Sequence, residues 1–378
     1  MRIHLDHNAT TPVCPEAIEA MEHALRASFG NPSSVTLEGS RARALVEQAR
    51  ERVAGLLAAT PEQVRFTSGA TEANNTLLFG LLAPGDHVVS TRIEHPSVSA
   101  PLERLAARGV AVDRVAPDAM GCVAVDAIVE AFRPQTRLVC VIWANNETGA
   151  IQPIPALAER CAERGIWLHA DATQAIGKLE LDLARTPVDS IASSAHKLGG
   201  PKGIGALIAR DQKAIPPLLV GGGQERGLRG GTENVVGIVG YGAACAVAAA
   251  EGVRRPQALR ALRDRLWQGI VERIDQVRWN GDPARVLPNT LNLEFRGVAG
   301  EVLLQALDLE GIAVSAGAAC HSGAVEPSPI LLAMGRTPEQ ARSSLRFSVG
   351  SGVEPQQIDF VIDRLATLVP RIRALGAP

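Results

Sequence analysis

Short apolar runs alternate with helical patterns between about residues 40 and 210, and this alternation constrains the fold more than any other feature. The segment from about Ser40 to Ala59 places apolar residues on one helical face. The apolar runs that read as strands are Val64–Thr67, His87–Ser90, Val110–Val115, Leu138–Trp143, Ile166–Ala170, Asp189–Ala195 and Ile204–Ala209. Such alternation predicts an α/β fold in which helices cover both faces of a mostly parallel sheet.

The pattern changes beyond roughly residue 255. The expected helices and strands there are Pro256–Ile274, Thr290–Glu294, Gly300–Leu309, Ile312–Val314, Ser344–Phe347 and a final helix from about Pro355 to Leu375. This mixture predicts a smaller α+β domain. We therefore assign residues 13–252 to a large domain, and residues 1–12 and 253–378 to a small one.

Charge, cysteine spacing and apolar stretches exclude several classes of protein. The formal net charge of -2 offers no general attraction to nucleic acid or anionic lipid. The N-terminus lacks the apolar stretch of a signal peptide, and the run Ala243–Ala250 is too short to span a bilayer. The six cysteines form no Cys-x-x-Cys pair, which argues against a local metal site. These features predict a reduced, cytoplasmic chain without a membrane segment or a bound metal.

The carboxyl ends of parallel strands form the ligand-binding edge of such sheets, so polar residues after each strand are candidates for a site. One candidate is the turn Phe66–Asn75, in which Ala70 and Thr71 stand where a helix is expected to begin. Free backbone N–H groups at a helix start attract phosphate. The alternative is an ordinary small-residue turn with a threonine cap.

Asp171 and Lys197 each follow an expected strand. A carboxylate at Asp171 is costly at a buried strand end unless it is paired, and a pyridinium nitrogen is one suitable partner. Lys197 precedes a glycine-rich turn, where a poorly solvated lysine can form a Schiff base. Lys202 is a rival, although its Gly-Pro-Lys-Gly setting is more typical of a turn. The alternatives are a capping or salt-bridging aspartate and a surface lysine.

Two further residues follow strands at the same expected edge. His95 can stack on a cofactor ring or transfer protons, whereas a lone histidine is more often a structural hydrogen-bonding group. Asn145 can bind a ring oxygen or a substrate, and its alternative is a plain turn.

Cys320 lies among glycines and other small residues, in Ser315–Ala324. Such a segment suits a mobile nucleophile better than a core cysteine, and the neighbouring His321 can assist thiolate formation. An incidental loop cysteine is the alternative. Arg346 on a short strand can bind a substrate carboxylate with two hydrogen bonds, or it is a surface arginine.

Taken together, these motifs resemble the cysteine desulfurases, which are fold-type I, class V aminotransferase-like enzymes dependent on pyridoxal phosphate (PLP). The matching segments cover nearly the whole chain: Leu5–Pro12, Gly30–Ser34, Thr67–Asn75, Glu94–Pro96, Asn145–Gly149, His169–Gln174, Ser194–Lys197, Leu228–Thr232, the Cys320 segment and Arg346. The resemblance implies a seven-stranded, mostly parallel sheet in the large domain, with the Cys320 segment and Arg346 in the small one.

The resemblance also implies residue roles. Lys197 would hold PLP as a Schiff base, Asp171 would pair with the ring nitrogen and His95 would stack on the ring. Substrate carboxylate binding would fall to Asn145 and Arg346. The remaining cofactor contacts would come from Ala70, Thr71, Asn145, Gln174 to the ring hydroxyl, Ser194, His196 and, from a second subunit of a homodimer, Thr232.

The implied reaction converts L-cysteine to L-alanine and leaves the sulfur as a persulfide on Cys320, for transfer to an acceptor protein. The Arg-Gly-Gly-Thr motif at Arg229–Thr232 is similar to the housekeeping branch that feeds iron–sulfur scaffolds, whereas Gly317–Ser322 is similar to selenocysteine lyases. A selenocysteine lyase is therefore one rival function. A class V transaminase that needs no cysteine is a second, and a PLP-free assembly subunit is a third. The intact Lys197, Asp171 and His95 argue against the PLP-free subunit.

Overall fold

The computed structural model describes residues 2–316 and 326–376 of the chain. A seven-stranded sheet forms its centre, in the order β2-β8-β7-β6-β5-β3-β4. Every neighbouring pair is parallel except those made by β8, which runs antiparallel to β2 and β7. The strands are β2 (Val64–Thr67), β3 (His87–Thr91), β4 (Ala111–Val115), β5 (Thr136–Ile142), β6 (Trp167–Asp171), β7 (Ser190–Ser194) and β8 (Gly205–Ala209).

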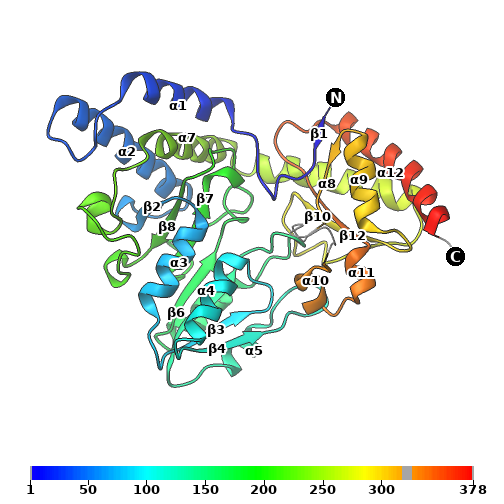
Figure 1. Cartoon of the computed structure of the whole chain (residues 1–378), viewed down its shortest axis with the longest axis horizontal. Coiled ribbons are helices and arrows are strands. Elements are labelled where there is room, and N and C mark those ends of the chain that lie inside the picture. Colours follow the sequence, from blue (N-terminus) through cyan, green and yellow to red (C-terminus); the bar gives the residue numbers. More distant parts are fainter. Residues whose placement is uncertain (1, 317–325, 377–378) are drawn as a thin grey trace.

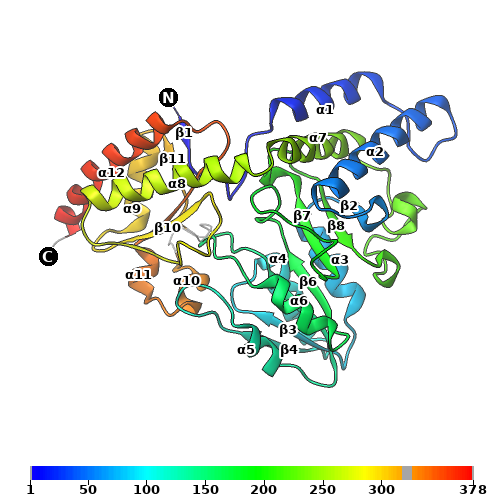
Figure 2. The ribbon, with the colours of Figure 1, turned by 180° about the vertical axis from the view of Figure 1, so that it is seen from behind.

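Helices cover both faces of this sheet (Figures 1 and 2). Within β5, Leu138 and Cys140 pack toward α3 and α4, whereas Val139 and Val141 belong to the core on the other face, beneath α2, α6 and α7. This alternation follows from the two-residue period of a strand. The helices are α1 (Pro15–Ala27), α2 (Leu37–Leu56), α3 (Ala70–Leu81), α4 (Pro96–Ala106), α5 (Val125–Glu130), α6 (Ile154–Ala162) and α7 (Val235–Glu251).

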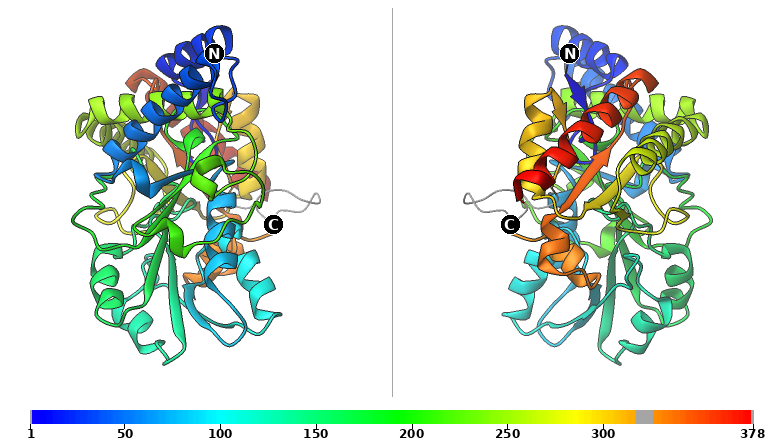
Figure 3. Two further views of the ribbon diagram at one scale, coloured as in Figure 1. Left: turned by 90° about the vertical axis from the view of Figure 1, so that its left-hand side faces the viewer. Right: turned by 90° about the vertical axis from the view of Figure 1, so that its right-hand side faces the viewer.

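The C-terminal part of the chain builds a separate apolar core beside the large sheet. An antiparallel sheet in the order β12-β10-β9 carries helices α8, α9 and α12, and α12 packs against both of the others (Figures 1 and 3). A parallel pair joins β1 at the N-terminus to β11. These elements are β1 (Ile3–His4), α8 (Arg254–Arg273), β9 (Val277–Trp279), β10 (Thr290–Phe295), α9 (Gly300–Leu309), β11 (Ile312–Ala313), α10 (Pro329–Ala333), α11 (Pro338–Arg342), β12 (Ser344–Ser348) and α12 (Pro355–Gly376).

The expected helices and strands all form, with ends shifted by a few residues. The helix expected from Ser40 begins at Leu37, because the Thr36 hydroxyl accepts a hydrogen bond from the Gly39 N–H group and caps the helix. The domain limits at residues 12 and 252 stay a prediction. No single helix within the described ranges is long and apolar enough to cross a membrane; only α7 and α8 taken together pass that test, and they are bent by 80° where they meet.

His7 anchors the segment after β1 to the end of strand β12. Its Nδ1 atom donates a hydrogen bond to the Ser348 carbonyl at 3.1 Å, and its ring fills the space beside Gly350, where an added Cβ would lie 1.8 Å from it. Burial, and next to it the charge of His4, lowers the pKa of His7 to about 4. His7 is therefore neutral in the folded protein at neutral pH.

This burial predicts acid sensitivity. The unfolded chain binds a proton at His7 below its ordinary pKa of 6.5, and the folded chain resists it until about pH 4, so stability falls as the pH falls between those values. At pH 5 the loss from His7 is roughly 2 kcal/mol. The free energy of unfolding, measured with denaturant at pH 7.5 and pH 5, should differ less between the two pH values in His7→Asn than in the wild type. The variant keeps a donor for Ser348 but does not titrate. An unchanged difference, or an equal effect from His23→Asn on the exposed face of α1, would contradict this account.

Candidate functional site

A pocket of about 610 Å³ opens at the carboxyl ends of the parallel strands. This volume is typical of a small-molecule site. Strands β2, β3, β5, β6 and β7 all end at this edge, which brings together residues far apart in the chain. The predicted site residues that line the pocket are Ala70, Thr71, His95, Asp171, Gln174, Ser194, His196, Lys197 and Arg346.

Lys197 stands at the end of the short 3-10 turn Ala195–Lys197, directly after β7. Its Nζ donates to the backbone carbonyls of Asn8 at 2.6 Å and Ala9 at 2.7 Å. Burial, and then the positive charge of Arg346, lowers the pKa of Lys197 to about 8. A sizeable fraction of this amine is therefore uncharged near neutral pH, as a Schiff-base lysine requires.

Lys202 also lines the pocket, from an exposed turn before β8. Exposure leaves the amine of such a lysine in contact with solvent. The structure therefore favours Lys197 over Lys202 as the nucleophilic amine.

Asp171 ends strand β6 and is buried, and its carboxylate is held from two sides. Oδ2 accepts a hydrogen bond from the Asn74 amide at 2.9 Å, and Oδ1 accepts from the Thr173 N–H group at 3.0 Å. Thr173 also lines the pocket, and its hydroxyl is buried without a hydrogen-bond partner among the described residues. The arrangement suits a ligand that brings a cationic or N–H group to Asp171.

His95 caps helix α4, because its Nδ1 accepts a hydrogen bond from the Ser97 N–H group at 3.0 Å. Neutral His95 therefore carries its proton on Nε2. Burial of the ring lowers the pKa of His95. The negative charge of Asp171 raises this pKa in part, and the positive charge of Lys197 lowers it further. The rest of the ring is exposed toward the pocket, where a flat ligand ring can cover it.

Asn74 connects these two residues. Its amide nitrogen donates to Asp171 and, at 2.8 Å, to the Ser97 hydroxyl, which lies 2.8 Å from Nδ1 of His95. Its amide oxygen lies 2.9 Å from Nε2 of the fully buried His169, so that nitrogen is the donor. A single buried asparagine therefore orients both the carboxylate and the histidine.

The part of the pocket next to the start of helix α3 suits an anion. Gly69 precedes α3 without a side-chain cap, so the backbone N–H groups of the first turn are left for a ligand. A Cβ on Gly205 would lie 2.7 Å from the Gly69 Cα atom, so β8 and this turn approach closely. Ser194 and His196 add a hydroxyl and an imidazole at the same pocket.

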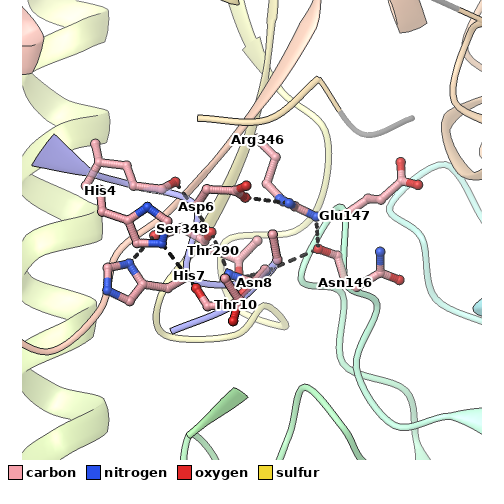
Figure 4. A network of polar contacts seen from close by, with 12 residues as sticks. His4, Asp6, His7, Asn8, Thr10, Asn146, Glu147, Thr290, Arg346 and Ser348 are labelled. Carbon is pink, nitrogen blue, oxygen red and sulfur yellow. Dashed lines mark hydrogen bonds and ion pairs between the residues drawn. The ribbon is translucent and has the colours of Figure 1, made fainter. Parts of the chain in front are cut away.

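Arg346 lies on β12 and lines the same pocket. Figure 4 shows its contacts with Asp6 and Asn146. Its Nη1 donates to the Asn146 carbonyl at 2.9 Å, and its Nη2 forms an ion pair with Asp6 at 2.6 Å. Its Nε is buried without a partner within the described chain. The guanidinium is thus held firmly, with N–H groups remaining for a carboxylate ligand.

Three predicted residues are not placed in the pocket. Asn145 is fully buried away from it: its amide donates to the Ile93 carbonyl, and its oxygen accepts from the Glu147 and Thr148 N–H groups. Asn145 therefore does not line the pocket in this structure and its ligand contact stays a prediction, whereas the adjacent Asn146 lines the pocket. Thr232 is exposed outside this pocket, and Cys320 lies outside the described residues.

Sequence reasoning missed the supporting residues Asp6, Asn8, Asn74 and Asn146. The polar cluster after β1, within Leu5–Pro12, was a signal for Asp6 and Asn8. Asn74 and Asn146 each stand next to another asparagine, and the sequence does not show which of the two points inward.

The pocket residues fit pyridoxal phosphate group by group. The start of α3 with Thr71, Ser194 and His196 suits a phosphate, and Asp171 suits a pyridinium nitrogen. Lys197 suits the aldehyde. An α/β sheet with these groups at its carboxyl edge defines the class of fold-type I PLP enzymes.

Within that class the chain belongs to the class-V aminotransferase family, whose model matches residues 3–361. It is 40% identical to the cysteine desulfurase IscS of Clostridium botulinum, covering 99% of this chain and 96% of that one. It is 43% identical to a cysteine desulfurase of Bradyrhizobium diazoefficiens, covering 98% of this chain and 95% of that one. Among solved structures, a NifS-like protein aligns with a TM-score of 0.91 at 33% identity, covering 98% of this chain and 100% of that one. The structure of SspA in complex with cysteine aligns with a TM-score of 0.81 at 32% identity, covering 92% of this chain and 99% of that one.

Proposed function

We infer that this chain is a PLP-dependent cysteine desulfurase that converts L-cysteine to L-alanine and retains the sulfur as a persulfide on Cys320. The observation that carries the proposal is the meeting of Lys197, Asp171 and His95 in one pocket that Ser315 also lines. Cys320 is five residues beyond Ser315 in the sequence and lies outside the described residues. The relatives named as cysteine desulfurases support the same reaction.

The bound cofactor would withdraw electrons from the substrate Cα and so weaken its C–H bond and then its Cβ–S bond. Lys197 would take the Cα proton, which its lowered pKa permits near neutral pH. Arg346 would hold the substrate carboxylate and Asp171 the ring nitrogen. The Cys320 thiolate would attack the substrate sulfur. Cysteine and the Cys320 thiol then become alanine and the Cys320 persulfide, with no outside oxidant or reductant.

Incubation of the PLP-loaded protein with L-cysteine tests the proposal. We expect one alanine for each sulfur recovered as persulfide or, with a thiol reductant, as sulfide. A yellow, folded protein that releases no alanine from L-cysteine would contradict the desulfurase assignment. A colourless protein that gains no visible absorption with added PLP would support the PLP-free subunit instead.

A second candidate is selenocysteine lyase, which the sequence Ala318-Ala-Cys-His-Ser322 favours. Both substrates would use the same cofactor and wall of the pocket. The ratio of kcat/KM for sulfide release from cysteine and selenide release from selenocysteine separates the two enzymes.

The fate of the sulfur and the assembly state complete the proposal. An acceptor protein, such as an iron–sulfur scaffold in the cytoplasm, would take the persulfide sulfur. The connection between α1 and α2 exposes Phe29 and Val35, the start of α2 exposes Leu37, and the segment before Thr232 exposes Leu219 and Val220. Large exposed apolar groups favour an interface. A homodimer would cover such groups and bring Thr232 to the partner's phosphate site. Light scattering should give twice the chain mass.

A further inference from the structure

Lys178 is a buried lysine beside the pocket for which the proposed reaction has no use. Its side chain is only 4% exposed, and it follows β6 in the segment that also carries Asp171 and Gln174. The chain has four lysines, at 178, 197, 202 and 213. Burying a lysine costs free energy, so its placement needs a reason.

Among the residues that the structure describes, the Lys178 amine donates to two side-chain oxygens and contacts no carboxylate. Its Nζ donates to Oε1 of Gln174 at 2.6 Å and to Oδ1 of Asn8 at 3.3 Å. The charges around it are those of Lys197, Arg255 and Arg346. Burial, and then these cations, lowers the pKa of Lys178 well below its ordinary value.

Gln174 is held in one orientation by two opposite contacts. Its Oε1 accepts from Lys178, and its Nε2 donates to the Asn8 carbonyl at 2.8 Å. A flipped amide would turn its oxygen toward the Asn8 carbonyl, which has no hydrogen to donate, so that contact would be lost, and it would remove the acceptor that the Lys178 amine now uses. The oxygen of Gln174 is thus occupied by Lys178, and because Gln174 lines the pocket, its second Nε2 hydrogen is the donor that remains for a ligand.

The Asn8 carbonyl also accepts from Lys197. Lys178, Gln174, Asn8 and the nucleophilic lysine therefore form one continuous hydrogen-bonded group.

We propose that Lys178 is a positioning residue that locks the Gln174 amide so that the pocket receives a hydrogen-bond donor, which selects a ligand oxygen in its anionic form. The inference rests on the proposed function, because the ligand oxygen is the ring oxygen of PLP. Such a donor stabilises the oxygen anion, and its loss makes that oxygen more basic.

The test measures the pH midpoint of the visible absorption change of bound PLP in four full-length proteins: wild type, Lys178→Met, Gln174→Met and the double variant. We expect the midpoint to rise by on the order of one pH unit in each single variant, the size of a hydrogen bond to a charged group. In the Gln174→Met background, Lys178→Met should add no further rise, because the lysine acts through that glutamine. Lys213→Met, on an exposed turn, is the matched control and should leave the midpoint unchanged.

The outcomes separate this inference from the proposed function. A yellow Lys178→Met protein with the wild-type midpoint would overturn the inference. The inference would also be overturned if Lys178→Met raised the midpoint equally with Gln174 and with Met at that position, because the lysine would then act directly. A loss of thermal stability alone would also overturn it. If Lys178→Met does not fold, Lys178→Gln replaces it in the same cycle and should show a smaller rise that again vanishes without Gln174. A wild-type protein that binds no PLP would overturn both proposals.

Discussion

The Lys197→Ala protein is expected to lose the visible absorption of covalently bound PLP and to release alanine from cysteine about 10³-fold more slowly or worse. The physical reason is the position of its amine. Lys197 lies in the pocket with Asp171 and His95, and it is the lysine whose pKa falls to about 8 there. Removing it takes away both the covalent attachment and the base for the Cα proton.

Absorption spectra and alanine release, measured with a circular dichroism check of folding, decide this prediction. Lys202→Ala is the matched control, because Lys202 lines the same pocket from an exposed turn. Borohydride reduction followed by peptide mapping should label Lys197 in both the wild type and this control. A label on Lys202, or a yellow and active Lys197→Ala protein, would contradict the assignment.

The Cys320→Ala protein is expected to bind PLP and cysteine normally, but to form no persulfide and to release alanine on the order of 10³-fold more slowly. The five cysteines of the described chain support this choice of nucleophile. Burial raises the pKa of each of their thiols and keeps them protonated: Cys14, Cys122, Cys140, Cys161 and Cys245. A protonated thiol is a poor nucleophile.

Single-turnover incubation with cysteine, followed by mass spectrometry of the intact protein, measures the added sulfur. Cys14→Ala is the control, since Cys14 is half-buried and lines a neighbouring cavity that Lys197 also borders. We expect this control to gain one sulfur, located on Cys320. Normal alanine release by Cys320→Ala would favour a transaminase-like enzyme, and sulfur on Cys14 would move the nucleophile there.

Much of the fold could be predicted from local patterns in the chain. The alternating apolar runs predicted strands β2 to β8, because a strand buried on both faces is mostly apolar. The glycine-rich and polar segments after those strands predicted most of the pocket wall, since parallel strands end at one edge. The order β2-β8-β7-β6-β5-β3-β4, with β8 reversed, is decided by long-range pairing and had no local signal.

The functional residues divide in the same way. The chain by itself determined which residue types stand after each strand, and therefore Lys197, Asp171 and His95. Only the tertiary structure decided that Asn146 rather than Asn145 faces the pocket, because Asn145 uses its amide within its own turn and against the Ile93 carbonyl. Likewise, only the tertiary structure brought Asn8, from the N-terminal segment, between Gln174 and Lys197. A hydrogen bond depends on distances of about 3 Å between groups, and residues hundreds of positions apart acquire such distances only when the chain has packed.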